Sequence, residues 1–101
     1  MNLIELENER LQWSLKIFTE ATPLSSLLKA EEEIKEIKEN IEKGIKDAEE
    51  YADVIMAVFD SAGRDGITPE EIVWAYYCKL KKNKARKWKK NSDNTYSHIK
   101  D

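Results

Sequence analysis

Four acidic residues are spaced so that they could hold a metal ion between two helices. Glu33 and Glu36 are three residues apart, and so are Glu50 and Asp53. On a helix this spacing places both carboxylates of a pair on one side. At about 6 Å and an effective dielectric near 20, each ionised pair costs roughly 3 kcal/mol, so two facing pairs need a cation. A ligand set made only of oxygens favours Mg²⁺, with Mn²⁺ as an alternative.

A plainer interpretation of these acids stays open. A glutamate run on a helix is usually a solvated face, and nearby lysines could pair with it (Lys29, Lys35 and Lys38). Glu50 lies three residues after Asp47 and could be its partner in a capping box. Asp53 favours the metal interpretation, because it directly precedes the apolar run 54–59, where an unpaired charge is costly.

A second candidate site lies in the C-terminal third of the chain. Lys79, Asn83 and Arg86 fall at i, i+4 and i+7, so they share one helical face. Lysine and arginine both bind phosphate oxygens, and this face could hold a polyphosphate. It could equally be a solvated basic helix end that complements the helix dipole.

Nucleic-acid binding is a further alternative for this basic segment. Eight of the twelve residues 79–90 are Lys or Arg, and Trp88 among them could stack on a base. The acidic segment 31–53 and the net charge of -3 disfavour this alternative. An acidic site and a basic face together favour a small polyanion that is bridged by metal. Trp13 is first of all a packing residue, although it could stack on a nucleotide base.

Helices must position all of these residues. Apolar residues recur at helical period from residue 3 to 18, from Pro23 to Gly44, from Asp47 to about Ala62, and from Thr68 to about Trp88. The third segment is apolar nearly all round between residues 54 and 59, which is typical of a buried central helix. The sequence therefore predicts an all-α fold of four helices. We expect one domain over residues 1–88 and a polar tail or lid over residues 89–101.

Length and composition narrow the class of protein. A chain of 101 residues is one small domain with a modest core of its own, which makes oligomerisation plausible. Three Gly and two Pro are too few for an all-β fold with many turns. The single Cys excludes an intramolecular disulfide. No apolar run approaches the ~20 residues of a membrane span, and the N-terminus lacks a signal pattern. We expect a soluble cytoplasmic protein.

The ordered motifs resemble those of the MazG-like all-α nucleotide pyrophosphohydrolases. The family pattern E-E-x-x-E reads Glu32-Glu33-Ile34-Lys35-Glu36 here, and after thirteen intervening residues E-x-x-D follows as Glu50-Tyr51-Ala52-Asp53. The chain is similar more narrowly to the phage and bacterial dATP/dGTP pyrophosphohydrolase branch. That branch shows a leucine-lysine run, an R-x-G-I turn and K-L-x-x-N-K-x-R-x-W, which match residues 27–29, 64–67 and 79–88.

The resemblance implies a four-helix MazG-like bundle that hydrolyses dATP or dGTP to the monophosphate and pyrophosphate. It implies that Mg²⁺ binds at the four paired acids and that Glu32 or Glu33 helps to activate water. It also implies that the substrate contacts Lys79, Asn83 and Arg86, and that the chain forms a homodimer or homotetramer. Three glutamates in a row, 31–33, leave the register of the first motif open. A non-catalytic helical binding module remains the competing class.

Overall fold

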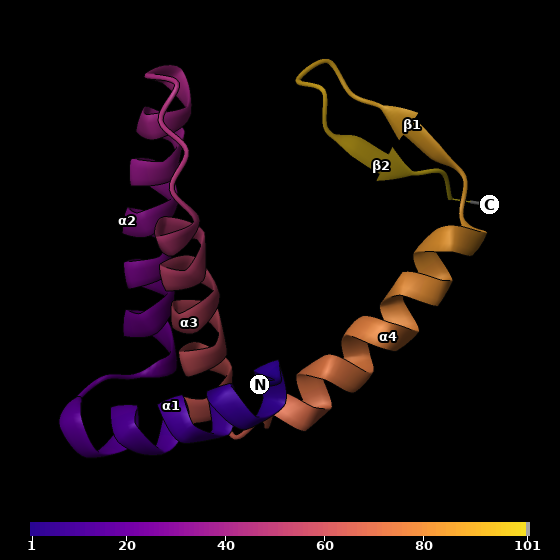
Figure 1. The fold of residues 1–101 in the computed structure, drawn as a ribbon. Coiled ribbons are helices and arrows are strands. Elements are labelled where there is room, and N and C mark those ends of the chain that lie inside the picture. Colours follow the sequence, from indigo (N-terminus) through magenta and orange to yellow (C-terminus); the bar gives the residue numbers. More distant parts are fainter. Residues whose placement is uncertain (101) are drawn as a thin grey trace. The chain divides into compact units, whose positions relative to one another are not determined.

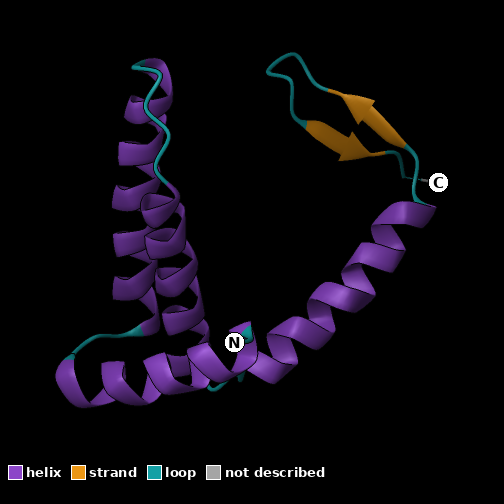
Figure 2. Ribbon diagram, viewed as in Figure 1, coloured by secondary structure: helices purple, strands orange, loops and turns teal. Residues whose placement is uncertain are grey.

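The structure, a computed structural model, describes residues 1–100 and contains four helices followed by a short β-hairpin (Figure 1). The chain forms two compact units, residues 1–71 and residue 72 onward, and each is described by itself. Helix content dominates, as Figure 2 shows. The elements are α1 (Leu3–Ile17), α2 (Pro23–Glu42), α3 (Ala48–Arg64), α4 (Pro69–Ala85), β1 (Trp88–Lys90) and β2 (Tyr96–His98). The prediction of four helices is confirmed.

Short polar residues begin the helices. Thr22 and Ser25 form a reciprocal capping box around Pro23 at the start of α2. Thr68 caps α4, because its hydroxyl oxygen accepts a hydrogen bond from the Glu71 amide at 3.1 Å. Such caps satisfy amides that have no partner inside the helix. They explain why the predicted starts of α2 and α4 agree with the structure to within a residue.

The first unit is built on an antiparallel pair of helices, α2 and α3, with α1 across one end of the pair (Figure 1). Gly44 ends α2 with a positive φ of 72°, a conformation that glycine adopts without strain. Gly63 lets α1 approach α3 closely. A Cβ added at Gly63 would lie 2.6 Å from a methyl carbon of Leu11, which is too short for any real contact.

The interior of the first unit is mostly polar. Ala30 is the buried hydrophobic residue of the described chain, whereas five polar or charged residues are buried (Glu7, Ser14, Ser26, Asp60 and Ser61). The prediction that the third helix is a buried central helix is wrong for a single chain. Ile55 and Val58 of α3 are 48% and 46% exposed, because α1 and α2 cover only part of its surface within this unit. An apolar pattern indicates that a helix surface is to be buried. It does not show that the same chain provides the residues that bury it.

The second unit contains a β-hairpin that the sequence interpretation missed. Trp88 pairs with His98 and Lys90 with Tyr96 in antiparallel register, and Asn94 in the turn has a positive φ of 71°. The fourth helix ends at Ala85, three residues earlier than predicted. The Trp88 indole nitrogen instead donates to the Asn83 carbonyl at 3.0 Å, which holds the first strand against the end of the helix. Within residues 1–100, no helix is both long and apolar enough to span a bilayer.

Candidate metal and nucleotide site

The packing register of α2 against α3 places two of the predicted metal ligands opposite each other. The Ser26 hydroxyl of α2 donates to Asp60 of α3 at 2.8 Å, which defines one level of the antiparallel pair. Two helical turns further on, seven residues forward in α2 and seven back in α3, stand Glu33 and Asp53. Both of these acids line one cavity, as the register requires.

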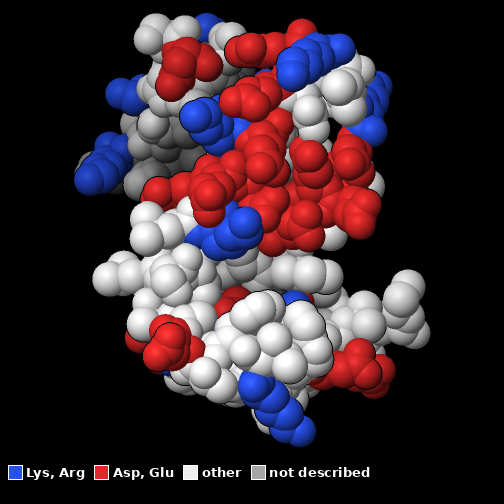
Figure 3. Space-filling model, turned by 90° about the vertical axis from the view of Figure 1, so that its left-hand side faces the viewer, with Lys and Arg blue, Asp and Glu red and all other residues white. Residues whose placement is uncertain are grey.

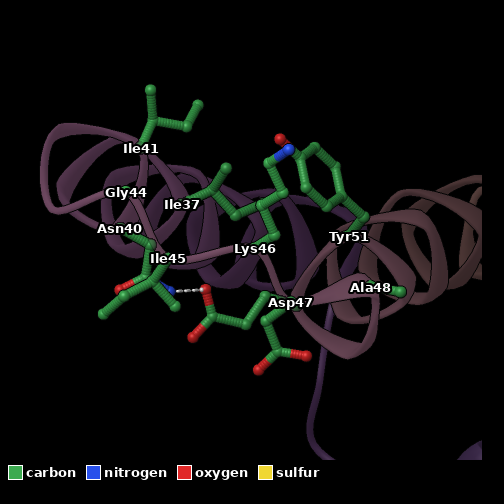
Figure 4. Close-up of a pocket in the computed structure, with 10 residues that line it drawn as sticks. Ile37, Asn40, Ile41, Gly44, Ile45, Lys46, Asp47, Ala48 and Tyr51 are labelled. Atoms are coloured by element: carbon green, nitrogen blue, oxygen red, sulfur yellow. Dashed lines mark hydrogen bonds between the residues drawn. The ribbon is translucent and has the colours of Figure 1, made fainter.

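One more turn along the pair brings Glu36 and Glu50 to the next level. Partial desolvation raises the pKa of Glu50 above its ordinary value, and the negative charges of Asp47, Glu36 and Glu33 raise it further. An amide hydrogen bond from Asn40 Nδ2 to Glu50 Oε2, 2.5 Å long, opposes this rise and is the dashed line in Figure 4. The carboxylates of Glu36 and Glu33 on α2 therefore repel the charge of Glu50 across the helix interface.

The capping alternative for Glu50 is not what the structure forms. Asp47 does cap α3, but it accepts its hydrogen bond from the Glu49 amide at 3.0 Å. The side chain of Glu50 turns instead to Asn40 on α2. It lines a cavity of about 470 Å³ at this end of the helix pair, together with Ile37 and Tyr51 (Figure 4). Glu50 is thus left on the α2-facing side of α3, where a metal ligand would be needed.

The cavity beside Glu33 and Asp53 joins acidic and aromatic walls. Its volume is about 430 Å³, and Trp13 and Phe18 line it with Met56. The two aromatic rings pack edge to face with centroids 5.4 Å apart. Three residues predicted independently, Trp13 and the two acids, therefore come together at one cavity. An aromatic surface beside carboxylates suits a ligand with a flat base at one end and charge at the other.

The acids differ in how far they are withdrawn from solvent. The side chain of Glu33 is 14% exposed and lies 3.7 Å from Lys29 Nζ, whereas Glu32 is 71% exposed and does not line the cavity. Asp53 is exposed, so its place beside the apolar run does not bury it in a single chain. In the view of Figure 3, acidic side chains gather in one broad patch over the α2–α3 part of the molecule.

The donor chemistry of these acids fits a hard divalent cation. Among residues 1–100, no three acidic, histidine or cysteine side chains converge into a ready-made metal cluster. The acids form two facing levels, Glu33 with Asp53 and Glu36 with Glu50. Mg²⁺ and similar ions commonly take only one or two carboxylates and complete their coordination with water and substrate phosphates. Two facing carboxylate levels match that mode better than a closed structural site.

The predicted basic residues also lie together within the second unit. Lys79 and Asn83 line a groove of about 480 Å³ along α4. Arg86 follows one residue after the end of α4, and its Nη1 donates to Asn83 Oδ1 at 3.1 Å. Lys79 and Asn83 therefore lie on one side of α4, as their spacing predicts, and Arg86 joins them through its hydrogen bond to Asn83.

A buried ionic network next to the cavity was missed from sequence. Asp60 accepts hydrogen bonds from Arg10, Ser14, Ser26 and Arg64 at 2.7 to 2.9 Å. Burial raises the pKa of Asp60, but these four donors outweigh it and hold the pKa well below its usual range. Two signals could have found the network: Arg10 stands in an otherwise apolar stripe, and Asp60 and Arg64 are four residues apart.

The neighbouring acid of the network, Glu7, responds to the same burial in the opposite way. Burial raises the pKa of Glu7, and its hydrogen bond and ion pair with Arg10 only partly offset that rise. The network as a whole ties α1 to both helices of the α2–α3 pair. It thereby fixes the helix that carries Trp13 relative to the helices that carry the acids.

Comparisons with known proteins identify the family of the chain. The sequence model of the dATP/dGTP pyrophosphohydrolase family matches residues 6–101. Among solved structures, the chain is similar to the cyanophage S-2L MazG-like pyrophosphohydrolase bound to dGDP and three catalytic Mn²⁺ ions per active site. The sequences are 27% identical, the TM-score is 0.81, and the alignment covers 99% of each chain. No curated protein matches the chain. The resemblance, the four-helix fold and the enzyme class predicted from sequence are confirmed, and the chain belongs to the dATP/dGTP pyrophosphohydrolase family of MazG-like enzymes.

Proposed function

We propose that this chain hydrolyses dATP or dGTP to the monophosphate and pyrophosphate, with a divalent metal held between α2 and α3. One observation carries the proposal: the helix register sets Glu33 opposite Asp53 and Glu36 opposite Glu50, with the first pair in the cavity that Trp13 lines. The structural relative described above, which binds dGDP and Mn²⁺, supports the same assignment. We expect Mg²⁺ to serve in solution, with Mn²⁺ able to replace it.

The residues divide the work along the cavity. A divalent metal held by the four paired acids would neutralise charge on the triphosphate and make the attacking water more acidic. Glu33 lies at the cavity wall and is placed to accept a proton from the attacking water, with exposed Glu32 as the alternative base. The water oxygen bonds to phosphorus, the bond between the α- and β-phosphoryl groups breaks, and pyrophosphate leaves. Trp13 packs on the base.

The basic face of the second unit is assigned to the triphosphate or the sugar. Lys79 and Arg86 offer cationic donors, and Asn83 offers an amide on the same side. Arginine binds phosphate with a planar fork and lysine as a point charge, so the pair suits a flexible polyphosphate. Both nucleoside triphosphates and the exposed free thiol of Cys78 suit the cytoplasm.

A second copy of the chain is proposed to cover the apolar surface left open in the first unit. Leu3, Leu6, Ile55 and Met56 line a groove of about 690 Å³ between α1 and α3, and all four are at least 44% exposed. Exposed apolar surface of this kind marks an interface in small chains. Light scattering after size exclusion should give a dimer or tetramer mass. A monomer that stays folded at micromolar concentration would contradict this part of the proposal.

The activity is tested by incubating the protein with each deoxynucleoside triphosphate and Mg²⁺ or Mn²⁺. We expect release of monophosphate and pyrophosphate from the purine nucleotides, and no release in EDTA. Hydrolysis of none, or release of orthophosphate alone, would contradict the proposal. Binding of single-stranded DNA that persists in EDTA, without any hydrolysis, would support the basic-surface alternative instead.

A further inference from the structure

One nitrogen in the buried ionic network has no hydrogen-bond partner. Arg10 Nε donates to both carboxylate oxygens of Glu7, at 2.8 and 3.0 Å, and Nη1 donates to Asp60 Oδ1 at 2.9 Å. Nη2 of the same guanidinium is buried and unpaired among the described residues. A buried donor without an acceptor is costly, so an acceptor from outside the chain is favoured at this position.

The second arginine of the network shows the contrast. Arg64 Nε donates to Asp60 at 2.7 Å, Nη1 donates to the Ala21 carbonyl, and Nη2 donates to the carbonyl and hydroxyl of Ser14. All three nitrogens of Arg64 are therefore used within the fold, and this side chain does not line the cavity. Arg10 does line it. The unpaired donor belongs to the arginine that borders the ligand space.

Arg10 borders that cavity at the Ser26–Asp60 level, two helical turns from Glu33 and Asp53. Arg10 and Trp13 are three residues apart on α1, so their side chains are neighbours, while Glu33 and Asp53 line the cavity from α2 and α3. If the acids hold the phosphates, as the proposed function requires, the base lies beside Trp13 and Arg10. Trp13 and Phe18 are 55% and 50% exposed, so a ligand can reach this part of the cavity wall from solvent.

We infer that Arg10 is a specificity-determining residue, whose Nη2 donates to the acceptor edge of a 6-oxopurine and so favours dGTP over dATP. This inference rests on the proposed function. Both purines carry the N7 acceptor, but guanine presents the O6 acceptor beside it whereas adenine presents an amino donor. A donor facing a donor leaves both groups unpaired, which a buried site disfavours strongly.

The wild-type enzyme can test this with four substrates that separate the two ends of the purine. dGTP and dITP share the 6-oxo group, whereas dATP and the 2-aminopurine deoxynucleoside triphosphate lack it. We expect kcat/KM to be similar for the first two and about tenfold higher than for the last two. Equal values for dITP and dATP would overturn the inference while leaving the proposed function intact. Hydrolysis of none of the four would refute both.

Two matched variants separate base reading from loss of the network. Arg10→Lys and Arg64→Lys both weaken the contacts to Asp60, but only Arg10 borders the cavity. We expect Arg10→Lys to reduce the tenfold preference for dITP over dATP to about threefold or less. Arg64→Lys should keep the preference even where total activity falls, because a ratio measured on one sample is independent of the folded fraction. Retention of the preference in Arg10→Lys would overturn the inference.

Discussion

The α2–α3 pair holds acids in two contrasting environments, two helical turns apart. At one level Asp60 is buried and receives four hydrogen bonds, two of them from arginines. At the next levels Glu33, Glu36, Glu50 and Asp53 share few partners. Lys29 lies 3.7 Å from Glu33, and Asn40 donates to Glu50. Donors from α1, α2 and α3 therefore surround Asp60, whereas the acids further along the same helix pair receive few.

This difference separates structural acids from acids kept for a ligand. The pKa of Asp60 is held far below its usual range, so Asp60 stays charged. Its oxygens already accept hydrogen bonds within the fold and are not free to bind a ligand. The pKa of Glu50 is raised by desolvation and by neighbouring carboxylates, so its charge gains from any cation that arrives. A carboxyl group whose pKa is raised by carboxylates across an interface is a candidate cation ligand, whereas one that already accepts several hydrogen bonds is not.

The largest effect on activity should follow from Asp53→Asn, which removes one carboxylate from the four proposed metal ligands. We expect turnover of the preferred nucleotide to fall by about a thousandfold, because a misplaced metal no longer activates water. The helix content by circular dichroism should stay near wild type, since Asp53 is exposed in the single chain. Steady-state assays at saturating Mg²⁺ measure the effect.

A matched control for this change is Glu49→Gln, on the same helix and also exposed. Its side chain has no partner in the proposed site, so activity should stay within about twofold of wild type. Equal losses in both variants would mean that negative charge on α3, rather than a metal ligand, is what matters. Full activity of Asp53→Asn would remove Asp53 from the site.

The next largest effect should be on stability and should follow from Asp60→Asn, which changes the acid that accepts four hydrogen bonds. Removing its charge leaves Arg10 and Arg64 without their shared partner, and we expect a loss of about 3 kcal/mol in the free energy of unfolding at pH 7. Because the folded pKa of Asp60 is depressed, its stabilisation is fully present above the unfolded pKa near 4. It is lost as the pH falls further toward the folded pKa.

The gap between wild type and Asp60→Asn should therefore be constant from about pH 5 to 8 and narrow below about pH 4. Urea unfolding at several pH values measures this gap. A gap that widens on acidification would mean that Asp60 is not the charged centre of the network. Ser26→Ala, which removes one neutral donor to the same carboxylate, should cost only about 1 kcal/mol.

The sequence predicted the four helices because each rests on local signals. Thr22, Thr68 and Gly44 act within a few residues of themselves, and they lie at the helix boundaries that the sequence predicts. The i, i+3 carboxylate pairs were equally readable, because helix geometry alone places them on one side. Their pairing across the interface needed the register of α2 on α3, which depends on the Ser26–Asp60 level.

The features that the sequence interpretation missed have three different physical causes. Arg10 and Asp60 are fifty residues apart, so the sequence marks each as unusual but does not show that the two are partners. The hairpin was hidden because its strands are three residues long and lie in a charged, polar segment without strict alternation. The expected burial of the apolar run on α3 failed for another reason, since one chain does not supply the cover.

The smallest expected effect is on stability. The change that Glu36→Gln causes in the free energy of unfolding should have opposite signs with and without metal. Glu36→Gln removes one of the charges that raise the pKa of Glu50. In EDTA we expect this variant to be slightly more stable than wild type, because like-charge repulsion across the interface is relieved. With saturating Mn²⁺ the order should reverse, because wild type gains more binding energy from the ion.

Thermal unfolding with and without Mn²⁺ measures this reversal, and Glu31→Gln is its control on the same helix. Glu31 is exposed and lies about 160° round α2 from Glu33, so it should change neither value by more than a few tenths of a kcal/mol. A Glu36 variant that is less stable in both conditions would place Glu36 with Asp60 among the structural acids. A variant that is more stable in both would show that Glu36 repels its neighbours without binding the metal. Only a reversal of the stability order between EDTA and Mn²⁺ identifies Glu36 as a metal ligand. Such an acid repels its neighbours in the metal-free chain, and the bound ion offsets that repulsion.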